Sequence, residues 1–432
     1  MNKIRVIKIN IGENTQRHSH ARRESARLWN RLVKLHKYCR KRHWPWPSKY
    51  QLQKHFKGQF ELHSQSIQAL IDKFSANIDS TRTKRKKGDK AARYPWKDQK
   101  RYQVVAWKGQ CIKRKGNWLT LPMGRGQTAI LIKVPGDIPP GKIVAVELGF
   151  RELRLTLSEP VEAVASAGDN TVAGDPGIIH QMMLTDGQSS TAIVGRGLRS
   201  LIQGKNRALA YYSSALSKTK KGSRKNRKLR CSKARMLETF ERRQRNLLHH
   251  AANLILDFCV EREAGTLVAG DIANIAKNKR KTQKGSRRSN QENSNSPIGK
   301  LYEYISYKGK LRGLELIKIN EAYTSQTCPV CGHRHKPTGR IYRCKSKTCN
   351  FVGIRDEVGA ANILNKHLND GTITSNEILP TGKVKYLRPV KLSSRPGVAR
   401  LTGGTLPNTT PCPVAGVSTP GSHEPLPLDS VA

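Results

Sequence analysis

The sequence is poor in acidic residues: its 432 residues include 31 Asp and Glu against 80 Lys and Arg, a formal net charge of +49. Because charges of one sign repel each other in a compact fold, an excess of this size predicts a polyanionic partner, namely nucleic acid. The sequence also lacks any apolar run of about 18 residues, which argues against a membrane-spanning protein. No signal-peptide hydrophobic segment follows Met1, so we expect a soluble cytoplasmic protein with no membrane partner.

Cysteine is scarce and is concentrated in one place. Of the nine cysteines, five lie far apart and indicate no disulfide framework. The other four fall within a 22-residue window: Cys328, Cys331, Cys344 and Cys349. Two cysteine pairs on two turns offer four thiolates in a tetrahedron, the ligand set of a closed structural Zn²⁺ site; free thiols are the alternative. His333 and His335 follow closely, but four cysteines complete the shell, so we expect these histidines at the surface.

Short strand patterns dominate the first 160 or so residues. Residues 1–12 alternate apolar and polar side chains and predict an opening strand. Apolar spacing predicts helices over residues 19–42 and 66–77, while the basic stretch 81–97 contains Gly and Pro and predicts a loop. Alternating segments between residues 102 and 157, punctuated by Pro and Gly, predict a small antiparallel barrel or sandwich with a helical insertion.

A mixed α/β pattern follows. Strands are predicted over residues 171–173, 178–185, 191–194, 266–269 and 314–319, with a long basic helical region ending near Glu263. Two further segments are predicted to lack regular structure. These are the polar stretch 277–295, expected to be a mobile loop, and the Pro- and Gly-rich C-terminus from about Lys383.

Two of the scarce acidic residues occupy distinctive positions. Asp175 lies where an apolar strand runs into a Pro-Gly turn, in AGDPGI, and Asp356 lies at a predicted helix start, in GIRDEVGAANIL. Each has a purely structural alternative, as a strand end or a helix cap.

Basic clusters predict the nucleic-acid contacts. Residues 84–87 and 218–235 are rich in Lys and Arg and are expected to neutralise phosphates. Tyr94 and Trp96 lie beside the first cluster and offer stacking surfaces for unpaired bases, although Trp96 is also a candidate core residue.

The motifs GDPGI, LVAGDIANI, AYTSQTCPVCG and RDEVGAANIL occur in the order found in TnpB proteins. The sequence resembles this family of transposon-encoded RNA-guided nucleases, which are related to the type V CRISPR effectors, clearly over residues 172–364 and loosely before them. The resemblance implies an α+β and α/β fold, with an N-terminal β-barrel ("wedge") carrying a helical recognition insert, then an RNase H-like RuvC domain with an inserted zinc ribbon. The implied domains are a wedge at 1–165 with its insert at about 15–80, a RuvC domain at 166–321 and 354–370, a zinc insert at 322–353, and a disordered tail at 371–432.

The resemblance also implies two Mg²⁺ ions held by carboxylates, one activating water and one stabilising the leaving oxygen. By motif, Asp175 matches the first catalytic Asp of the family and Asp356 the last. The family's middle Glu is missing, because the central strand ends in Gly270-Asp271, and alternation turns Asp271 to the opposite face. Glu321, at the end of a predicted neighbouring strand, is expected to take over the role, with Asp271 as a fourth or outer ligand. The alternatives are a broken site and a solvated charge at position 321.

We therefore expect a Mg²⁺-dependent RNA-guided DNA endonuclease of the prokaryotic cytoplasm, associated with the nucleoid, with guide RNA and target double-stranded DNA as partners. The resemblance implies phosphodiester hydrolysis that leaves a 3′-hydroxyl and a 5′-phosphate. In such systems the guide reads the sequence by base pairing. One alternative is a nuclease-dead RNA-guided DNA-binding protein that acts as a repressor or targeting factor. Another is a zinc-ribbon nucleic-acid-binding protein without a guide, and the oligomeric state stays open.

Overall fold

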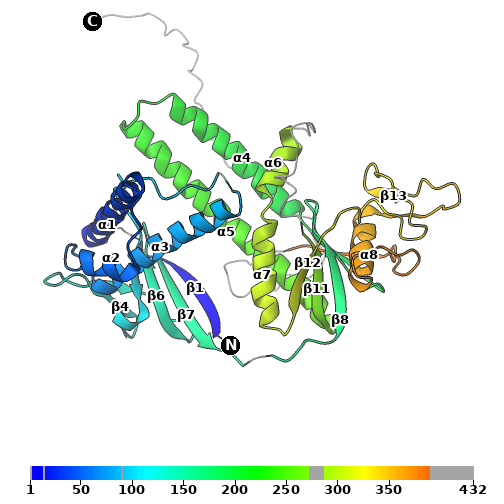
Figure 1. Ribbon diagram of the computed structural model, residues 1–432, viewed down its shortest axis with the longest axis horizontal. Helices are drawn as coiled ribbons and strands as arrows, with labels where there is room; N and C mark the ends of the chain where they lie inside the picture. Colours follow the sequence, from blue (N-terminus) through cyan, green and yellow to red (C-terminus); the bar gives the residue numbers. More distant parts are fainter. Residues whose placement is uncertain (1, 13–14, 90, 163, 272–286, 390–432) are drawn as a thin grey trace, which may run out of the picture. The chain divides into compact units, whose positions relative to one another are not determined.

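The computed structural model describes residues 2–12, 15–89, 91–162, 164–271 and 287–389. The N-terminal strands form two antiparallel sheets (Figure 1). The first has the order β1-β7-β6-β2 and consists of β1 (Asn2–Asn10), β7 (Glu152–Pro160), β6 (Lys142–Leu148) and β2 (Val105–Lys108). The second consists of β3 (Lys113–Lys115), β4 (Trp118–Leu121) and β5 (Ile130–Lys133). The predicted opening strand and antiparallel module are confirmed, while closure into a barrel stays a prediction.

Three helices are inserted between β1 and β2: α1 (Gln16–Lys41), α2 (Lys49–Phe56) and α3 (Ser64–Lys86). The Thr15 side chain caps α1 by accepting a hydrogen bond from the His18 N–H. Ser48 and Gln51 form a capping box at the start of α2. The apolar faces of the helices pack with the sheets into one core that includes Phe74 and the fully buried Trp107.

The prediction of a loop from residue 81 onward is wrong for residues 81–86, which continue α3. The Thr81 hydroxyl donates to the Asn77 carbonyl, 2.8 Å away, within the helix. The basic residues at the end of α3 lie where the helix dipole favours positive charge, which explains why a Lys- and Arg-rich stretch stays helical. Trp96 is 61% exposed, so a core role for it is wrong too.

The later part of the chain is built on a six-stranded mixed sheet with the order β12-β11-β8-β9-β10-β15. Its strands are β8 (Asn170–Asp175), β9 (His180–Thr185), β10 (Ser190–Val194), β11 (Ala264–Gly270), β12 (Glu315–Ile319) and β15 (Val384–Leu387). β8 runs antiparallel to β9 and parallel to β11, which in turn runs parallel to β12. The predicted strands of this part are all confirmed.

Helices cover both faces of this sheet (Figure 1). They are α4 (Arg196–Ser217), α5 (Arg224–Glu261), α6 (Arg287–Asn295), α7 (Ile298–Lys310) and α8 (Arg355–Leu368). Apolar residues of α5 and α7 pack on one face, and those of α8 pack on the other. Burial on both faces fits the apolar centres of these strands, VAG in β8, MML in β9 and LVAG in β11.

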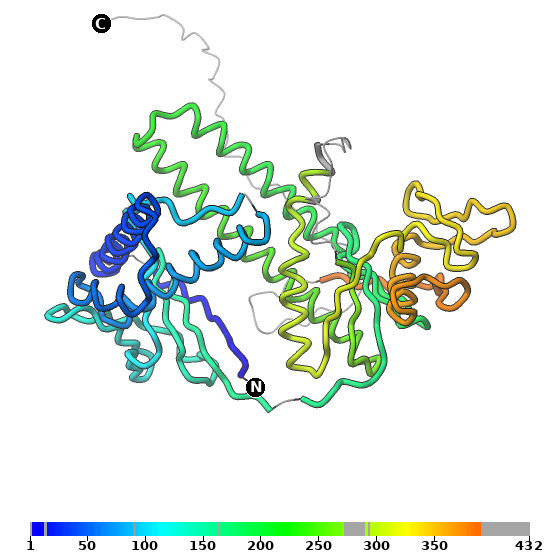
Figure 2. The backbone as a smooth tube through the Cα atoms, viewed as in Figure 1, coloured from blue at the N-terminus to red at the C-terminus, as the bar shows by residue number. Residues whose placement is uncertain are grey.

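The helices α4 and α5 lie side by side, as Figure 2 shows. In α5 the buried residues are concentrated between Leu248 and Cys259, near the sheet. The basic residues 218–235 belong to the other end of this helix pair, where most side chains are exposed. The predicted basic cluster is therefore a surface feature, with side chains accessible to phosphates.

Two predictions of irregular structure are wrong in part. The part of the predicted loop 277–295 that the structure describes forms α6, and the rest lies outside the described residues. Residues 371–389, predicted as part of a disordered tail, contain β15, which pairs parallel with β10. The backbone groups along the edge of β10 pair with those of β15, and this pairing holds the four-residue strand in place. The remainder of the tail lies outside the described residues. No helix in the described ranges has the length and apolarity needed to cross a membrane.

Candidate active site and metal centre

The sheet topology brings three acidic residues to one edge. Asp175 is the last residue of β8, and its parallel neighbour β11 ends at Gly270. Glu321 lies two residues beyond the end of β12, the next parallel strand. Asp356 is the second residue of α8, which packs on β8. Because parallel strands end at the same edge, residues far apart in sequence meet there.

Glu321 occupies the space beside Gly270. A Cβ atom placed on Gly270 would lie 3.0 Å from the Glu321 Cβ and 3.3 Å from its carboxyl carbon, and nearer still to its Oε2. A side chain at position 270 and the present Glu321 side chain would therefore overlap. The Glu321 side chain, which follows the strand next to β11, therefore fills the space that a side chain at position 270 would take.

Asp175 lies against α8. A Cβ atom on Gly359 would come within 2.7 Å of the Asp175 Oδ2 and 3.0 Å of its Cγ. Gly359 is about one helical turn beyond Asp356, so the Asp175 carboxylate lies next to the first turn of α8. The absence of a side chain at position 359 is what permits this approach.

The Asp356 carboxylate is held by two cationic or hydrogen-bonding neighbours. Its Oδ2 lies 2.8 Å from the His180 Nδ1, and its Oδ1 lies 3.5 Å from an Arg355 guanidinium nitrogen. Burial raises the pKa of Asp356, but the hydrogen bond and charge of His180 and the charge of Arg355 outweigh it and lower the pKa. Asp356 is therefore a fixed, ionised carboxylate.

The ionised forms of the other two carboxylates, Asp175 and Glu321, are disfavoured by their surroundings. Desolvation raises the pKa of Asp175 well above its ordinary value, and the charges of Glu321 and Asp356 raise it further. Desolvation and the charge of Asp271 raise the pKa of Glu321 to about 7. A bound divalent cation would offset this repulsion, and carboxylate oxygens are the hard donors that Mg²⁺ prefers. The residues present therefore fit the implied metal.

Asp271 is exposed and lies beside these acids rather than among them. Its backbone N–H donates to the Ile319 carbonyl at 2.7 Å, which extends the pairing of β11 with β12. Its charge raises the pKa of Glu321, so it is close enough to act on the site without replacing Glu321.

Two residues that sequence analysis missed support the site. The buried Tyr302 of α7 donates a hydrogen bond of 2.6 Å to the Gly270 carbonyl and fixes the end of β11. Burial and the charges of Glu321 and Asp175 raise its pKa, so it remains a donor. His180, which holds Asp356, lies in a predicted strand, but nothing in the sequence sets either residue apart.

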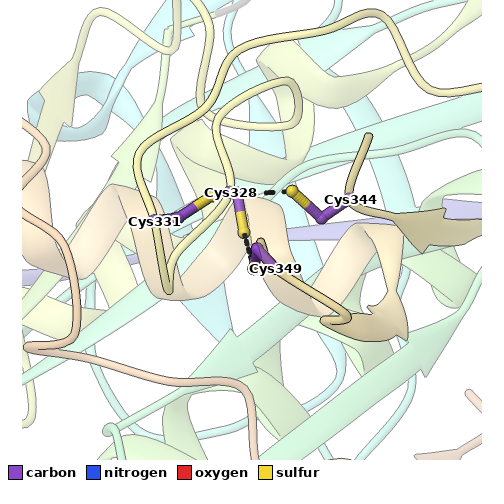
Figure 3. A group of neighbouring side chains, drawn as sticks. All are labelled: Cys328, Cys331, Cys344 and Cys349. Atoms are coloured by element: carbon purple, nitrogen blue, oxygen red, sulfur yellow. Dashed lines mark hydrogen bonds between the residues drawn. The ribbon is translucent and has the colours of Figure 1, made fainter. Parts of the chain in front are cut away.

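The four cysteines come together as predicted (Figure 3). The Cys328 and Cys349 sulfurs are 3.8 Å apart, and those of Cys331 and Cys344 are 3.6 Å apart. Four sulfurs at Zn–S bonds of about 2.3 Å around a tetrahedral ion lie about 3.8 Å from one another. The cluster can therefore hold zinc. Within the described residues it is the one group of three or more His, Cys, Asp or Glu whose ligand atoms all lie within 4.8 Å.

The ligand oxygens of Asp175, Glu321 and Asp356 do not all lie within 4.8 Å of one another.

The cysteine insert is anchored to α8. It contains a two-stranded sheet of β13 (Ile341–Arg343) and β14 (Val352–Ile354), and the latter runs directly into α8. The buried Asn362 side chain of α8 donates to the Thr324 and Thr327 carbonyls at 2.7 and 2.9 Å. His333 is exposed, and His335 lies 3.3 Å from the Tyr342 hydroxyl, so neither completes the cysteine shell.

The predicted stacking residues differ in exposure. Tyr94 is partly buried, with the Arg40 and Arg85 guanidinium carbons 4.7 and 5.0 Å from its ring centre. Trp96 is exposed, with the Lys97 ammonium 5.4 Å from its ring centre. Trp96 thus offers an accessible aromatic face next to positive charge.

Comparisons with known proteins agree with these features. A family model described as "Cas12f1-like, TNB domain" matches residues 299–363. TnpB-like protein MJ0751 of Methanocaldococcus jannaschii is 31% identical over 160 residues, which are 37% of this chain and 55% of that protein. CRISPR-associated endodeoxyribonuclease Cas12f2 of a Micrarchaeota archaeon is 35% identical over 83 residues, 18% of this chain and 15% of that protein. The matches thus span about half of the first relative and less of the second.

Two solved structures share the fold. The Cas12f1–sgRNA–target DNA complex aligns with a TM-score of 0.51 and 15% identity, covering 81% of this chain and 82% of that one. The mini-RNA-guided endonuclease CRISPR-Cas_phi3 aligns with a TM-score of 0.52 and 10% identity, covering 87% and 94%. The mixed α/β fold of this chain is therefore similar to theirs over most of its length.

Proposed function

We propose that the chain is a member of the family of TnpB proteins and type V CRISPR effectors and that it is an RNA-guided DNA endonuclease with a relocated glutamate. Within this proposal, residues 1–165 form the wedge with its helical insert, and residues 322–353 form the zinc insert. The RNase H-like RuvC domain comprises residues 166–321 and 354–370, and we extend it to residue 389 because β15 completes its sheet.

The observation that carries the proposal is the overlap of Glu321 with the space beside Gly270. A solvated strand-end charge would point away from the other acids. Instead, Glu321 is close enough to Asp175 to raise the pKa of that residue. This favours a complete carboxylate set over the alternative of a nuclease-dead binding protein.

We assign Asp175, Glu321 and Asp356 as the residues that would hold the Mg²⁺ ions, with Asp271 at the margin. When bound, such ions activate water and stabilise the leaving oxygen of a phosphodiester, which gives a 3′-hydroxyl and a 5′-phosphate. The protein orients these ligands. His180 fixes the Asp356 carboxylate, and Tyr302 fixes the strand end beside Glu321.

We propose guide RNA and target double-stranded DNA as the partners, in the prokaryotic cytoplasm near the nucleoid. The net charge of +49 and the exposed basic residues of α4 and α5 supply the phosphate contacts. The four cysteines hold one structural zinc ion in the insert that follows Glu321.

The test is cleavage of a target plasmid by the protein with its co-purified RNA and Mg²⁺, together with a gel-shift measurement of DNA binding. We expect Asp175→Ala and Glu321→Gln to abolish cutting while binding persists. The matched control is Glu315→Gln, an exposed glutamate at the other end of β12, which should cut normally.

Three outcomes decide between the alternatives. A wild-type protein that binds the target but never cuts it is the nuclease-dead binder. If Glu321→Gln still cuts and Asp271→Ala does not, then Asp271, and not Glu321, is the third metal-binding carboxylate. Co-purified RNA of random sequence supports the guide-free zinc-ribbon protein instead.

A further inference from the structure

A cavity of about 470 Å³ lies on the sheet face opposite α8. Its floor includes Gly177 and Ile178, which belong to the turn that follows Asp175, and Gln181 of β9. Leu198 and Ile202 of α4 and Leu248 of α5, with Ile298 and Leu301 of α7, form apolar walls. The volume falls within the about 300–1,000 Å³ that small-ligand sites occupy.

Gln181 is the buried, unpaired amide of this cavity, whose other polar lining residues are Arg199, Gln203, Asn206, Arg207, Gln291, Glu292 and Ser296. Its side chain is 3% exposed, yet neither its amide oxygen nor its amide nitrogen has a hydrogen-bond partner among the described residues. Buried polar groups in proteins are nearly always paired. Gln181 lines the cavity and its amide has no partner, so a ligand that offers one hydrogen-bond donor and one acceptor side by side would satisfy both amide atoms.

A β-bulge puts Gln181 in this position. In the pairing of β9 with β10, Ile193 lies opposite Met182 and Val194 lies opposite His180, so Gln181 is the extra residue. Met182 packs in the core under α5, while His180 reaches Asp356 on the α8 side. Bulges re-aim side chains near functional sites. One bulge thus sends His180 toward the acids and Gln181 into the cavity.

The charges at the cavity suit a nucleotide. Arg199 and Glu292 of α6 both line it and pair with each other, with nitrogen–oxygen distances of 2.9 to 3.2 Å, so their charges offset one another. Arg207 also lines it and is exposed, so its charge is available to a phosphate. Apolar walls can sandwich a base, and the two amide atoms of Gln match the donor–acceptor edge of adenine.

The cavity is linked to the acids by two short paths. Gly177 is two residues beyond Asp175 along the chain. Leu301 in the cavity wall precedes Tyr302, which is bonded to the Gly270 carbonyl. The cavity therefore lies beside the turn that follows Asp175, on the sheet face opposite the one where Asp175 meets α8.

We propose that this cavity receives an unpaired base of the target DNA strand next to the cleavage point, held by Gln181; this rests on the function proposed above. Adenine is the base that its amide fits best. The site holds the strand while the acids act on the neighbouring phosphodiester.

The test uses the guided full-length Glu321→Gln protein, which should bind without cutting, and target duplexes carrying the fluorescent adenine analogue 8-vinyladenine, which keeps N6 and N7, at one position at a time. We expect one position near the cut to brighten when the complex forms. Gln181→Leu and Ile202→Phe, which remove the amide and fill the cavity, should abolish that change. Gln188→Leu, an exposed glutamine in the β9–β10 turn, should not.

Cleavage by the protein with Glu321 intact gives a second readout. Its single-turnover rate should favour adenine at the responding position by about fivefold or more, and Gln181→Leu should remove this preference. Each other outcome overturns the proposal. Complexes that form by gel shift without brightening, or that brighten equally in Gln181→Leu, leave the proposed function intact but exclude this site. Brightening only with 8-vinyladenine in the guide RNA assigns the cavity to RNA, and failure to form any guided complex overturns both proposals.

Discussion

Glu321 stands where a side chain on Gly270 would stand, so the two positions compete for one space. The competition is reciprocal: either position can supply a carboxylate to this place, but not both at once. This makes the relocation testable by exchange.

We predict that Gly270→Glu in the presence of Glu321 lowers the cleavage rate, because two glutamate side chains then overlap in a space that holds one. The double variant Gly270→Glu/Glu321→Gly should regain a large part of the activity. The single Glu321→Gly variant should lose more than about 100-fold, beyond what loss of an outer-shell partner costs. Cleavage rates on one guided target measure this, and an inactive double variant that still folds and binds DNA would count against the exchange.

We predict that Gly359→Ala inactivates the enzyme without unfolding it. The new methyl group would come within 2.7 Å of the Asp175 Oδ2, and the side chain can only respond by rotating away. Gly299→Ala in α7 is the control, because a Cβ there meets nothing within 4 Å. Melting temperature and cleavage rate should separate the two variants, and normal cutting by Gly359→Ala would contradict the placement of Asp175.

We predict that the N-terminal module loses stability as pH falls from about 6.5 to about 4. His36 is 3% exposed among Trp46, Phe74 and Tyr94, and burial, with the charges of Arg40 and Arg82, lowers its pKa to about 4. The unfolded chain binds this proton near pH 6.5 but the folded one does not, so stability is complete above 6.5 and falls below it.

The effect is on the order of 3 kcal/mol at about 1.4 kcal/mol per pKa unit. Urea unfolding at several pH values measures it. His36→Phe should make the free energy of unfolding less dependent on pH in this range. His55→Phe, at an exposed position, should leave the pH dependence as it is in the wild type. Equal slopes in wild type and His36→Phe would disprove the assignment.

We predict one zinc ion per chain and its loss in Cys349→Ser. Because Asn362 bonds the insert to α8, loss of the ion should also loosen the helix that carries Asp356 and reduce cleavage. Cys231→Ser, which alters an exposed cysteine of α5, should keep both metal and activity. Zinc content by elemental analysis checks this, and full zinc occupancy in Cys349→Ser would refute the ligand set.

The parts that sequence predicts well are those set by local pattern. Apolar runs ending at Asp175 and Gly270 gave the strands, and cysteine spacing gave the metal cluster. That Glu321 reaches the acids was predictable because parallel neighbours end at one edge.

The missed features depend on pairing or on packing at a distance. The bulge at Gln181 exists only in the register between β9 and β10. Tyr302 and His180 matter because of single contacts to residues far along the chain. β15, with four residues, is too short to be recognised without the strand it joins.

That short strand also has a protective role. β15 lies along β10 at the end of the sheet order and covers backbone N–H and C=O groups that would otherwise be unpaired. An open strand of this kind is a template for pairing with another molecule. A protein cut off before Val384 would therefore keep Asp175, Glu321, Asp356 and the four clustered cysteines and still tend to self-associate, which makes the C-terminal boundary of any shortened version a question of solubility rather than of catalysis.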